Sequence, residues 1–393
     1  MPTWIIEPRD PLIVRDGRPF GPEPGARAHS LSFPFPSTTT GGLRKLAGLT
    51  ADGTFDRRLA EPNHPDSVLK IGVRGPLLVM LNDDGTFHEW LLPAPADALL
   101  LRGDEGDAKQ SVRRVQLMPL QTTDHSVYAP PRSGEPYLVG PQKAVSEKPF
   151  GASPRFWFWS AFSAWLDKPA DGPCDVTTLG IGGPISESRT HVRINPTTQT
   201  AEEGFLFQTS GLEFTGPERR RLALVVESDR TLAHWNSGMT SLGGERRLVA
   251  WRPGDRTLPA CPDDVRRRIV TERACRVILL TPAHFTAGYR PSWLLEARCG
   301  VQPALQAAAV PRAQVISGWD LRDNRPKPTR RLAPAGSVYF LSLAAPHDNA
   351  VQQWIDAIWM QNISDALQDR LDGFGLATLG VWDGQPVAME VQS

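Results

Sequence analysis

The stretch that decides the fold lies near the end of the chain and reads Leu371-Asp372-Gly373-Phe374-Gly375-Leu376-Ala377-Thr378-Leu379-Gly380-Val381-Trp382-Asp383. Apolar residues recur at helical spacing from Asp348 to Leu371, and Ala377 to Trp382 is expected to be a strand. A dinucleotide fingerprint requires strand, glycines and helix in that order, with the third glycine three residues after the second. Here the order is reversed and Gly380 comes five residues after Gly375, which excludes a Rossmann site.

The glycines of this stretch need separate explanations. Asp348 or Asn349 can cap the start of the predicted helix, and Gly373 suits a left-handed cap at its end. Gly373 alone is explained equally well as a cap or as part of a binding loop. A cap uses one glycine, so we expect Gly375 to lie against an RNA backbone or an adjacent backbone.

Length and composition limit the class of protein. A chain of 393 residues with 40% hydrophobic content fits two or three soluble domains. No apolar run approaches the roughly 18 residues of a membrane span, and the first twelve residues lack signal-peptide character, so a cytoplasmic protein is expected. The four cysteines are scattered without CxxC spacing, which predicts reduced, mostly buried thiols and no zinc site. The formal net charge of zero means that any nucleic-acid binding must be local.

The periodicity of the chain predicts an α+β fold with antiparallel sheets. Helices are expected from Ser37 to Leu49, from Ser153 to Leu166 and from Asp348 to Leu371, among many short strands. We place a domain boundary near residue 210, which divides the chain into 1–210 and 211–393. Residues 97–131 have no clear period, and partner contact, RNA contact and disorder in the free protein are the alternatives, with disorder favoured.

Two segments near the start of the chain suit phosphate. Arg15 and Arg18 lie in a turn rich in arginine and aspartate and could fork phosphates, or could pair with Asp10 and Asp16. The predicted helix at Ser37 has hydroxyls, glycines and cations in its first turns, where backbone N–H groups suit an anion; simple capping is the alternative. The candidate residues there are Thr39, Gly41, Gly42 and Arg44.

Two further arginine sites occur in the middle of the chain. Residues 187–195 and 205–207 predict a long β-hairpin on which Arg189, His191 and Arg193 share one face, either as an RNA contact or as an ordinary solvated face. The turn at 243–247 presents Arg246 in a similar way. The arginine triplets at 219–221 and 266–268 are interpreted as solvated charge.

Catalytic motifs are missing from the sequence: it has no nucleophile elbow, phosphate-binding lysine loop or metal-ligand cluster. His29 and His191 could serve as general acid and base in RNA cleavage, and this stays an open alternative.

Taken together, the opening from Asp10 to Phe20, the helix start at Ser37, the hairpin from Glu187, the turn at Gly243 and the terminal glycine loop resemble one family. The family is subunit 3 of the Cmr complex, the RNA-guided type III-B CRISPR effector, within the RAMP superfamily. The resemblance spans Asp10 to Asp383. It implies two tandem ferredoxin-like (RRM-like) domains with long loop insertions, one near 97–131, and a glycine-rich loop at 373–380.

The resemblance also implies a function in antiviral defence. The subunit would be non-catalytic, without cofactor or metal, and would hold the 5′ repeat-derived tag of the crRNA. It would join the large polymerase-like subunit to the first backbone RAMP subunit, meeting target RNA only indirectly. The alternative is a RAMP-type endoribonuclease that processes guide RNA. The expected RNA-binding residues are Arg15, Arg18, Thr39, Gly41, Gly42, Arg44, Arg189, His191, Arg193, Arg246, Gly373 and Gly375.

Overall fold

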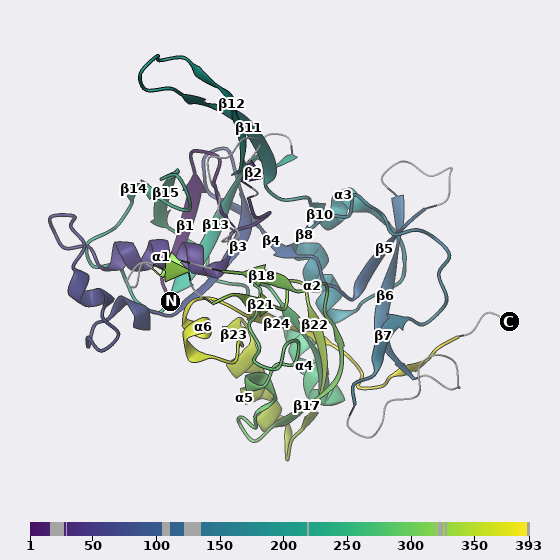
Figure 1. The fold of residues 1–393 in the computed structure, drawn as a ribbon. Helices are drawn as coiled ribbons and strands as arrows, with labels where there is room; N and C mark the ends of the chain where they lie inside the picture. Colours follow the sequence, from purple (N-terminus) through teal and green to yellow (C-terminus); the bar gives the residue numbers. More distant parts are fainter. Residues whose placement is uncertain are drawn as a thin grey trace. The chain divides into compact units, whose positions relative to one another are not determined.

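The computed structural model describes residues 1–15, 27–28, 30–103, 111–121, 135–217, 220–317, 319–320, 325–326 and 328–390. The chain forms two compact units, and each is assembled from three separate stretches (Figure 1). The first unit comprises Met1–His88, Gly183–Thr257 and Val315–Arg331, and the second comprises Glu89–Gly182, Leu258–Gln314 and Leu332–Ser393. The chain therefore returns to each unit twice, unlike the consecutive domains 1–210 and 211–393 that we expected. Residue 210 lies within a strand of the first unit.

The first unit is built on an antiparallel sheet. Its strands lie in the order β3-β13-β1-β15-β14, and every neighbouring pair is antiparallel. Helix α1 covers one face, where Gly42 lies against Leu242 and Trp251. The elements are β1 (Thr3–Pro8), α1 (Pro36–Ala47), β3 (Val73–Leu81), β13 (Arg221–Ser228), β14 (Gly238–Ser241) and β15 (Leu248–Pro253).

A long hairpin projects from the first unit (Figure 1). It consists of β11 (Ile185–Ile194) and β12 (Ala201–Glu213), with the short β2 (Arg27–Ala28) paired parallel to β12. The hairpin that the sequence predicts is confirmed, although its second strand begins earlier than expected. The remaining short elements of this unit, or at its ends, are η1 (Arg57–Ala60), η2 (Val68–Lys70), β18 (Gln314–Ile316), β19 (Trp319–Asp320), β20 (Arg325–Pro326) and β21 (Arg330–Leu332).

The second unit contains an antiparallel sheet in the order β17-β22-β16-β24-β23, with α4 and α5 packed beside β24. The elements are α4 (Asp263–Glu272), β16 (Ala274–Leu279), η4 (Trp293–Leu295), β17 (Gln302–Ala309), β22 (Val338–Ala344), α5 (Asp348–Ile358), β23 (Gln361–Asn362), α6 (Leu367–Leu371) and β24 (Leu376–Val381).

The principal strands of the two sheets have the same order. If the edge strands β14 and β23 are left aside, each sheet runs fourth, first, third, second in chain order: β15-β1-β13-β3 and β24-β16-β22-β17. In the first unit a helix, α1, follows the first strand. In the second unit a helix, α5, follows the third strand.

The rest of the second unit is also rich in strands. One group contains β4 (Phe87–Pro93), β8 (Phe156–Phe158), α2 (Trp159–Asp167), α3 (Val176–Leu179) and β10 (Gly180–Ile181). Another has β6 (Ser111–Gln121) paired with β5 (Ala98–Arg102), β7 (Leu138–Pro141), β9 (Gly172–Asp175) and β25 (Val387–Ala388). Strands β5 and β6 lie in the segment 97–131, for which disorder was the favoured expectation; that expectation is wrong for them.

Two sequence-based predictions of helices need correction, and one helix was missed. The helix expected from Asp348 to Leu371 is broken into α5 and α6, because Met360 has a φ of 51° and Gln361 pairs with Ala377 of β24. His347, whose Nδ1 accepts from the Ala350 N–H at 3.1 Å, caps α5. The helix expected from Ser153 begins only at Trp159, since the three residues before it form β8. Helix α4, which contains the arginine triplet 266–268, was not predicted.

Candidate functional site

The hairpin β11–β12 carries a basic and aromatic face. Arg189 and His191 alternate along β11, so their side chains point to one side, and Arg193 follows where the register with β12 shifts between Val192 and Ile194. The His191 ring stacks on Phe207 with centroids 5.2 Å apart and an angle of 17° between planes. The Arg193 guanidinium carbon lies 5.3 Å from the centre of the Phe205 ring. The sequence prediction that these three basic residues share a face is therefore confirmed, and it missed the two phenylalanines.

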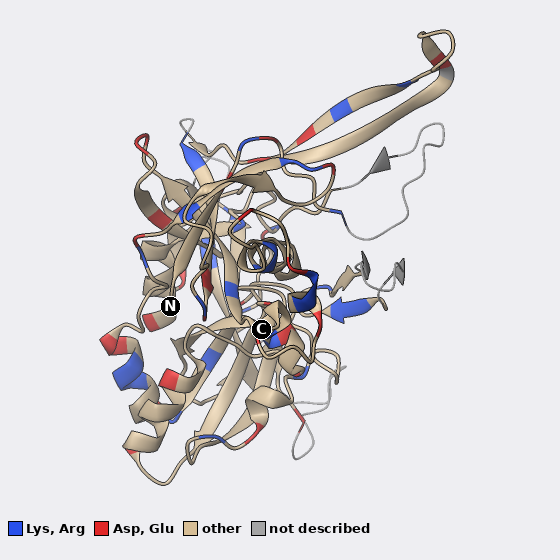
Figure 2. Ribbon diagram, turned by 90° about the vertical axis from the view of Figure 1, so that its left-hand side faces the viewer, with Lys and Arg blue, Asp and Glu red and all other residues tan. Residues whose placement is uncertain are grey.

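Each arginine of this face has a glutamate partner. Arg189 Nε donates to Glu187 Oε1 at 2.8 Å, and Arg193 Nε lies 3.1 Å from Glu202 Oε2. Figure 2 shows basic and acidic residues along the hairpin. The side chains of Arg189 and Arg193 are 47% and 50% exposed, so solvent screens both ion pairs and they contribute little to stability. A phosphate oxygen can therefore replace the carboxylate at little cost.

The opposite face of the hairpin carries aliphatic side chains in its outer part. Val192 lies directly across from Leu206, and both are exposed, as is Ile194. The sequence analysis did not single out these residues, although their alternation with the basic ones could have indicated them.

Arginines from distant parts of the chain meet at the turn 243–247. Glu245 Oε1 accepts from Arg15 Nη2 at 3.1 Å, and Glu245 Oε2 accepts from Arg247 Nη2 at 3.0 Å. Arg246 is exposed, and its φ of 54° places its backbone in the left-handed region of a turn. Arg15 thus pairs with Glu245, where Asp10 and Asp16 had been considered as partners. Arg18, like His29, lies outside the described residues.

The start of α1 differs from the expected phosphate site. Thr39 is fully buried, and its hydroxyl donates to the Pro36 carbonyl at 3.1 Å. Arg44 is also buried and donates to the carbonyls of Leu69 and Ile71 at 3.1 and 2.9 Å. Both side chains therefore serve the interior of the unit, contrary to the expectation that they face a phosphate.

The two glycines of α1 have different surroundings. A Cβ on Gly42 would lie 2.8 Å from Leu242 Cδ1, so packing explains this glycine. A Cβ on Gly41 would meet nothing within 4 Å. The N-cap position, Phe35, makes no side-chain capping bond, and Pro36 begins the helix instead of a hydroxyl cap.

The glycine loop of the second unit is an internal structure. Gly373 and Gly375 are buried with φ values of 93° and 84°. The Gly375 N–H donates to the Pro282 carbonyl at 2.8 Å, and a Cβ there would lie 2.8 Å from the Ser364 nitrogen. The Gly373 carbonyl accepts from the Thr281 hydroxyl at 2.8 Å. Of the two neighbours expected for Gly375, the structure places protein backbone there.

A polar cluster supports this loop. His284 Nδ1 and Asp369 Oδ2 lie 2.8 Å apart. The guanidinium carbons of Arg298 and Arg370 are 3.7 and 4.6 Å from the centre of the Trp293 ring. Burial, and then the nearby charge of Arg298, lowers the pKa of Arg370. These residues were missed by the sequence analysis because they are separated along the chain.

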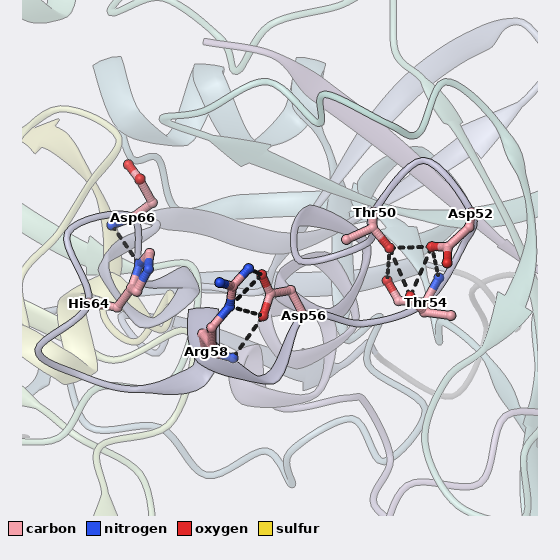
Figure 3. Close-up of polar contacts among 7 residues, drawn as sticks. All are labelled: Thr50, Asp52, Thr54, Asp56, Arg58, His64 and Asp66. Atoms are coloured by element: carbon pink, nitrogen blue, oxygen red, sulfur yellow. Dashed lines mark hydrogen bonds and ion pairs between the residues drawn. The ribbon is translucent and has the colours of Figure 1, made fainter.

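Two carboxyl groups with strongly lowered pKa values lie in turns of the first unit, that of Asp52 exposed and that of Asp56 partly buried (Figure 3). The Thr50 hydroxyl, followed by the Thr54 N–H, lowers the pKa of Asp52 to about 2. A hydrogen bond from the Arg58 side chain lowers that of Asp56 to about 2. These bonds join residues within a few positions of each other, so they organise the turns locally.

Among the described residues no group of three or more metal-ligating side chains comes together. No helix in the described ranges is long and apolar enough to cross a membrane. All four cysteines are free thiols, but only Cys275 is buried and Cys299 is exposed, so the expectation of mostly buried thiols is wrong.

Comparison with known proteins matches the chain to one family model and to solved chains. The family model described as "CRISPR-associated protein (Cas_Cmr3)" matches residues 4–382. No curated protein sequence matches the chain. Two solved chains resemble it at 14% identity. One, from "Cryo-EM structure of the Type III-B Cmr-beta bound to cognate target RNA and AMPPnP, state 1", has a TM-score of 0.46 over 91% of this chain and 88% of the other. The second, from the complex bound to cognate target RNA, has a TM-score of 0.47 over 86% of each chain.

Proposed function

The chain belongs to the Cas_Cmr3 family of CRISPR-associated proteins, and we propose from this membership that it is a guide-RNA-binding, non-catalytic subunit of a type III-B effector complex. In this role it holds the 5′ repeat-derived tag of the crRNA. It also joins the large polymerase-like subunit to the first backbone RAMP subunit, and it works in antiviral defence in the cytoplasm.

The observation that carries the RNA-binding proposal is the basic and aromatic face of the hairpin. Arg189 and Arg193 provide guanidinium forks for phosphates, and their exposed glutamate pairs are readily exchanged. His191 and Phe207 are already stacked, and aromatic surfaces of this kind can extend a stack onto a nucleobase. Arg15, Arg246 and Arg247 supply further donors at the turn 243–247.

Both sheets support a ferredoxin-like interpretation of the two units. A ferredoxin-like domain has four antiparallel strands and two helices in the order β-α-β-β-α-β. The shared order of fourth, first, third and second strand fits this arrangement in each unit. The segments 229–247 and 280–301, where the other helix of each unit would lie, contain no α-helix. We interpret each unit as a ferredoxin-like sheet that keeps one of the two helices.

The charge balance predicts how RNA is bound. With zero net charge and each hairpin arginine paired, the lone chain neutralises few phosphates. Its affinity should be low and its salt slope shallow, since both grow with the number of phosphate contacts. Tight binding then requires the neighbouring subunits.

The test compares RNA affinity against salt for the chain with its two proposed partner subunits. The double variant Arg189→Gln with Arg193→Gln should weaken binding and reduce the salt slope by about 2, one unit for each lost contact. The matched control Arg57→Gln removes an exposed arginine from η1 and should change neither quantity. Equal affinity and slope in both variants would rule out the hairpin as the RNA contact.

The same complexes test the endoribonuclease alternative. Cleavage of a repeat RNA by the wild-type chain, lost in His191→Ala, would overturn the non-catalytic assignment. The assay also needs His29→Ala, because His29 is the other candidate acid or base.

A further inference from the structure

A cavity of about 530 Å³ lies in the first unit, away from the hairpin residues discussed above. It is lined by the end of β1, the turn between β3 and β4, the start of β13 and the end of β15. Its charged lining residues are Glu7, Arg9, Asp84, Arg221, Arg252 and Asp255. The sequence analysis assigned no role to this group and interpreted Arg221 as solvated charge.

The cavity lies on the face of the sheet that α1 leaves uncovered. Ile6 of β1 pairs with Trp251, and Trp251 lies against Gly42 of α1. Strand alternation places Glu7 on the other face, and Arg252, which pairs with Ile5, shares that face. The strands therefore hold these two side chains in fixed positions in the cavity.

Three arginines converge on the single carboxylate of Glu7. This side chain is only 8% exposed, and its Oε1 accepts from Arg252 Nε at 2.8 Å. Arg252 Nη2 also donates to the Gly85 carbonyl. The other oxygen, Oε2, lies 3.7 Å from Arg9 Nη2 and 3.8 Å from Arg221 Nη1. These two distances exceed the range of a hydrogen bond.

Arg9 and Arg221 thus keep donor groups for a ligand. Their side chains are 48% and 42% exposed, whereas the carboxylate that attracts them is buried. Arg221 Nε is buried and has no hydrogen-bond partner within the described part of the chain. A guanidinium carries five N–H donors in a planar fork that matches an oxyanion.

The acidic residues at the cavity remain negatively charged, and one oxygen of Asp84 already accepts two hydrogen bonds from Thr86. The Thr86 hydroxyl, its N–H and the charge of Arg221 lower the pKa of Asp84, and the two Thr86 bonds occupy Asp84 Oδ1 at 2.7 and 2.9 Å. The formal charges of the lining residues sum to zero, so a ligand must be held by local geometry. That arrangement favours a small group with several acceptor oxygens placed between Arg9 and Arg221.

We propose that this cavity binds a phosphate group between Arg9 and Arg221, as part of a nucleotide-sized ligand. The volume exceeds that of a phosphate ion and lies within the range of about 300–1,000 Å³ found for ligand pockets. The phosphate belongs either to an RNA chain or to a free mononucleotide. In the first case the inference rests on the proposed function; in the second it is independent of it.

The experiment measures binding of adenosine 5′-monophosphate, inorganic phosphate and adenosine to the full-length chain by calorimetry. The nucleotide should bind, phosphate more weakly, and adenosine not at all. Arg9→Gln with Arg221→Gln should lower the affinity for the nucleotide by about tenfold or more, because two charge-assisted hydrogen bonds are lost. Arg57→Gln serves as the matched control. Measurable binding of adenosine with the same affinity as its monophosphate would overturn the proposal.

A variant with the opposite sign separates binding from folding. Glu7→Gln removes the charge that competes with the ligand, so it should tighten binding of the nucleotide, whereas a folding defect could only weaken it. Weaker binding by Glu7→Gln in a chain with unchanged circular dichroism would also overturn the proposal.

The RNA source is tested in parallel with single-stranded RNA and the assembled partner subunits. If the wild-type chain binds no free nucleotide, a loss of RNA affinity in the Arg9 and Arg221 double variant supports a backbone phosphate as the ligand. If neither nucleotide nor RNA binding depends on these arginines, the cavity is not a phosphate site. A null result for the hairpin variants would refute the hairpin contact alone, because nucleotide binding is measured separately.

Discussion

The buried ion pair between Asp97 and Arg276 should dominate the stability of the second unit. Both side chains are fully buried, and Arg276 Nη1 donates to Asp97 Oδ2 at 2.6 Å. Arg276 Nη2 and Nε also donate to the carbonyls of Trp165 and Val381 at 2.6 and 2.9 Å. The remaining carboxylate oxygen accepts from the Trp165 indole N–H at 2.9 Å. One guanidinium thus ties together four segments that are far apart in the chain.

Replacing Asp97 by alanine leaves an uncompensated buried charge. Removal of one partner of such a pair costs about 3–5 kcal/mol. For a domain of this size, each kcal/mol lowers the melting temperature by about 2–4 °C, so a decrease of about 6–20 °C is expected. Unfolding is followed by tryptophan fluorescence in urea and by calorimetry of the intact chain, with exposed Asp66→Ala as the control.

A double variant makes the prediction specific. For many buried pairs, hydrophobic replacement of both partners restores stability. Here Asp97→Leu with Arg276→Met removes the donor from the buried carbonyls of Trp165 and Val381, and each lost bond costs about 1–3 kcal/mol. The double variant should therefore remain destabilised. A loss below about 1 kcal/mol in Asp97→Ala, or full recovery in the double variant, would refute this reasoning.

Three further predictions concern single residues. Gly375→Val should destabilise the second unit by about 2–5 kcal/mol, because the φ of residue 375 is 84° and the new side chain would clash with the Ser364 backbone. A variant that keeps its stability but binds RNA more weakly would contradict this. At pH 8 a thiol reagent should modify exposed Cys299 quickly and buried Cys275 only on unfolding, since burial raises the pKa of the Cys275 thiol; mass spectrometry of the labelled peptides checks this order. The Asp52 carboxyl should titrate near pH 2, because its pKa is lowered from the ordinary 3.8. The ionised carboxylate therefore stabilises the turn above about pH 4, and this stabilisation is lost as the pH falls towards 2. A midpoint near 3.8 in a carbon NMR titration would contradict this.

The sequence predicted those helices and strands that are determined by interactions between residues close together in the chain. The hairpin was found from alternation and turn residues, and α1 from its apolar spacing, because neither depends on distant contacts. The helix after Asp348 was predicted too long, since the positive φ of Met360 and the pairing of Gln361 with β24 are tertiary effects. The order of the strands and the interleaving of the two units also depend on long-range pairing.

The candidate site was predictable only in part for a related reason. Composition identifies arginines, but burial decides whether an arginine supports the fold or is available to a ligand. Arg44 and Arg276 donate to buried backbone carbonyls, whereas Arg189 and Arg193 form exposed pairs. In the sequence, Arg44 and Arg189 are alike because both lie in motifs of the same family. Only the environment of each guanidinium separates them.

This distinction determines how loss of RNA binding should be interpreted. Substitution of a buried arginine such as Arg44 leaves two carbonyl groups without a hydrogen-bond donor. The substitution therefore lowers the free energy of unfolding and weakens RNA binding only indirectly. Substitution of an exposed arginine such as Arg193 leaves the fold intact and changes the salt slope, because a phosphate contact is lost. A variant therefore identifies an RNA contact only when its melting temperature is unchanged while its salt slope falls. By that criterion Arg189 and Arg193 can report on RNA, and Arg44 can report only on the fold.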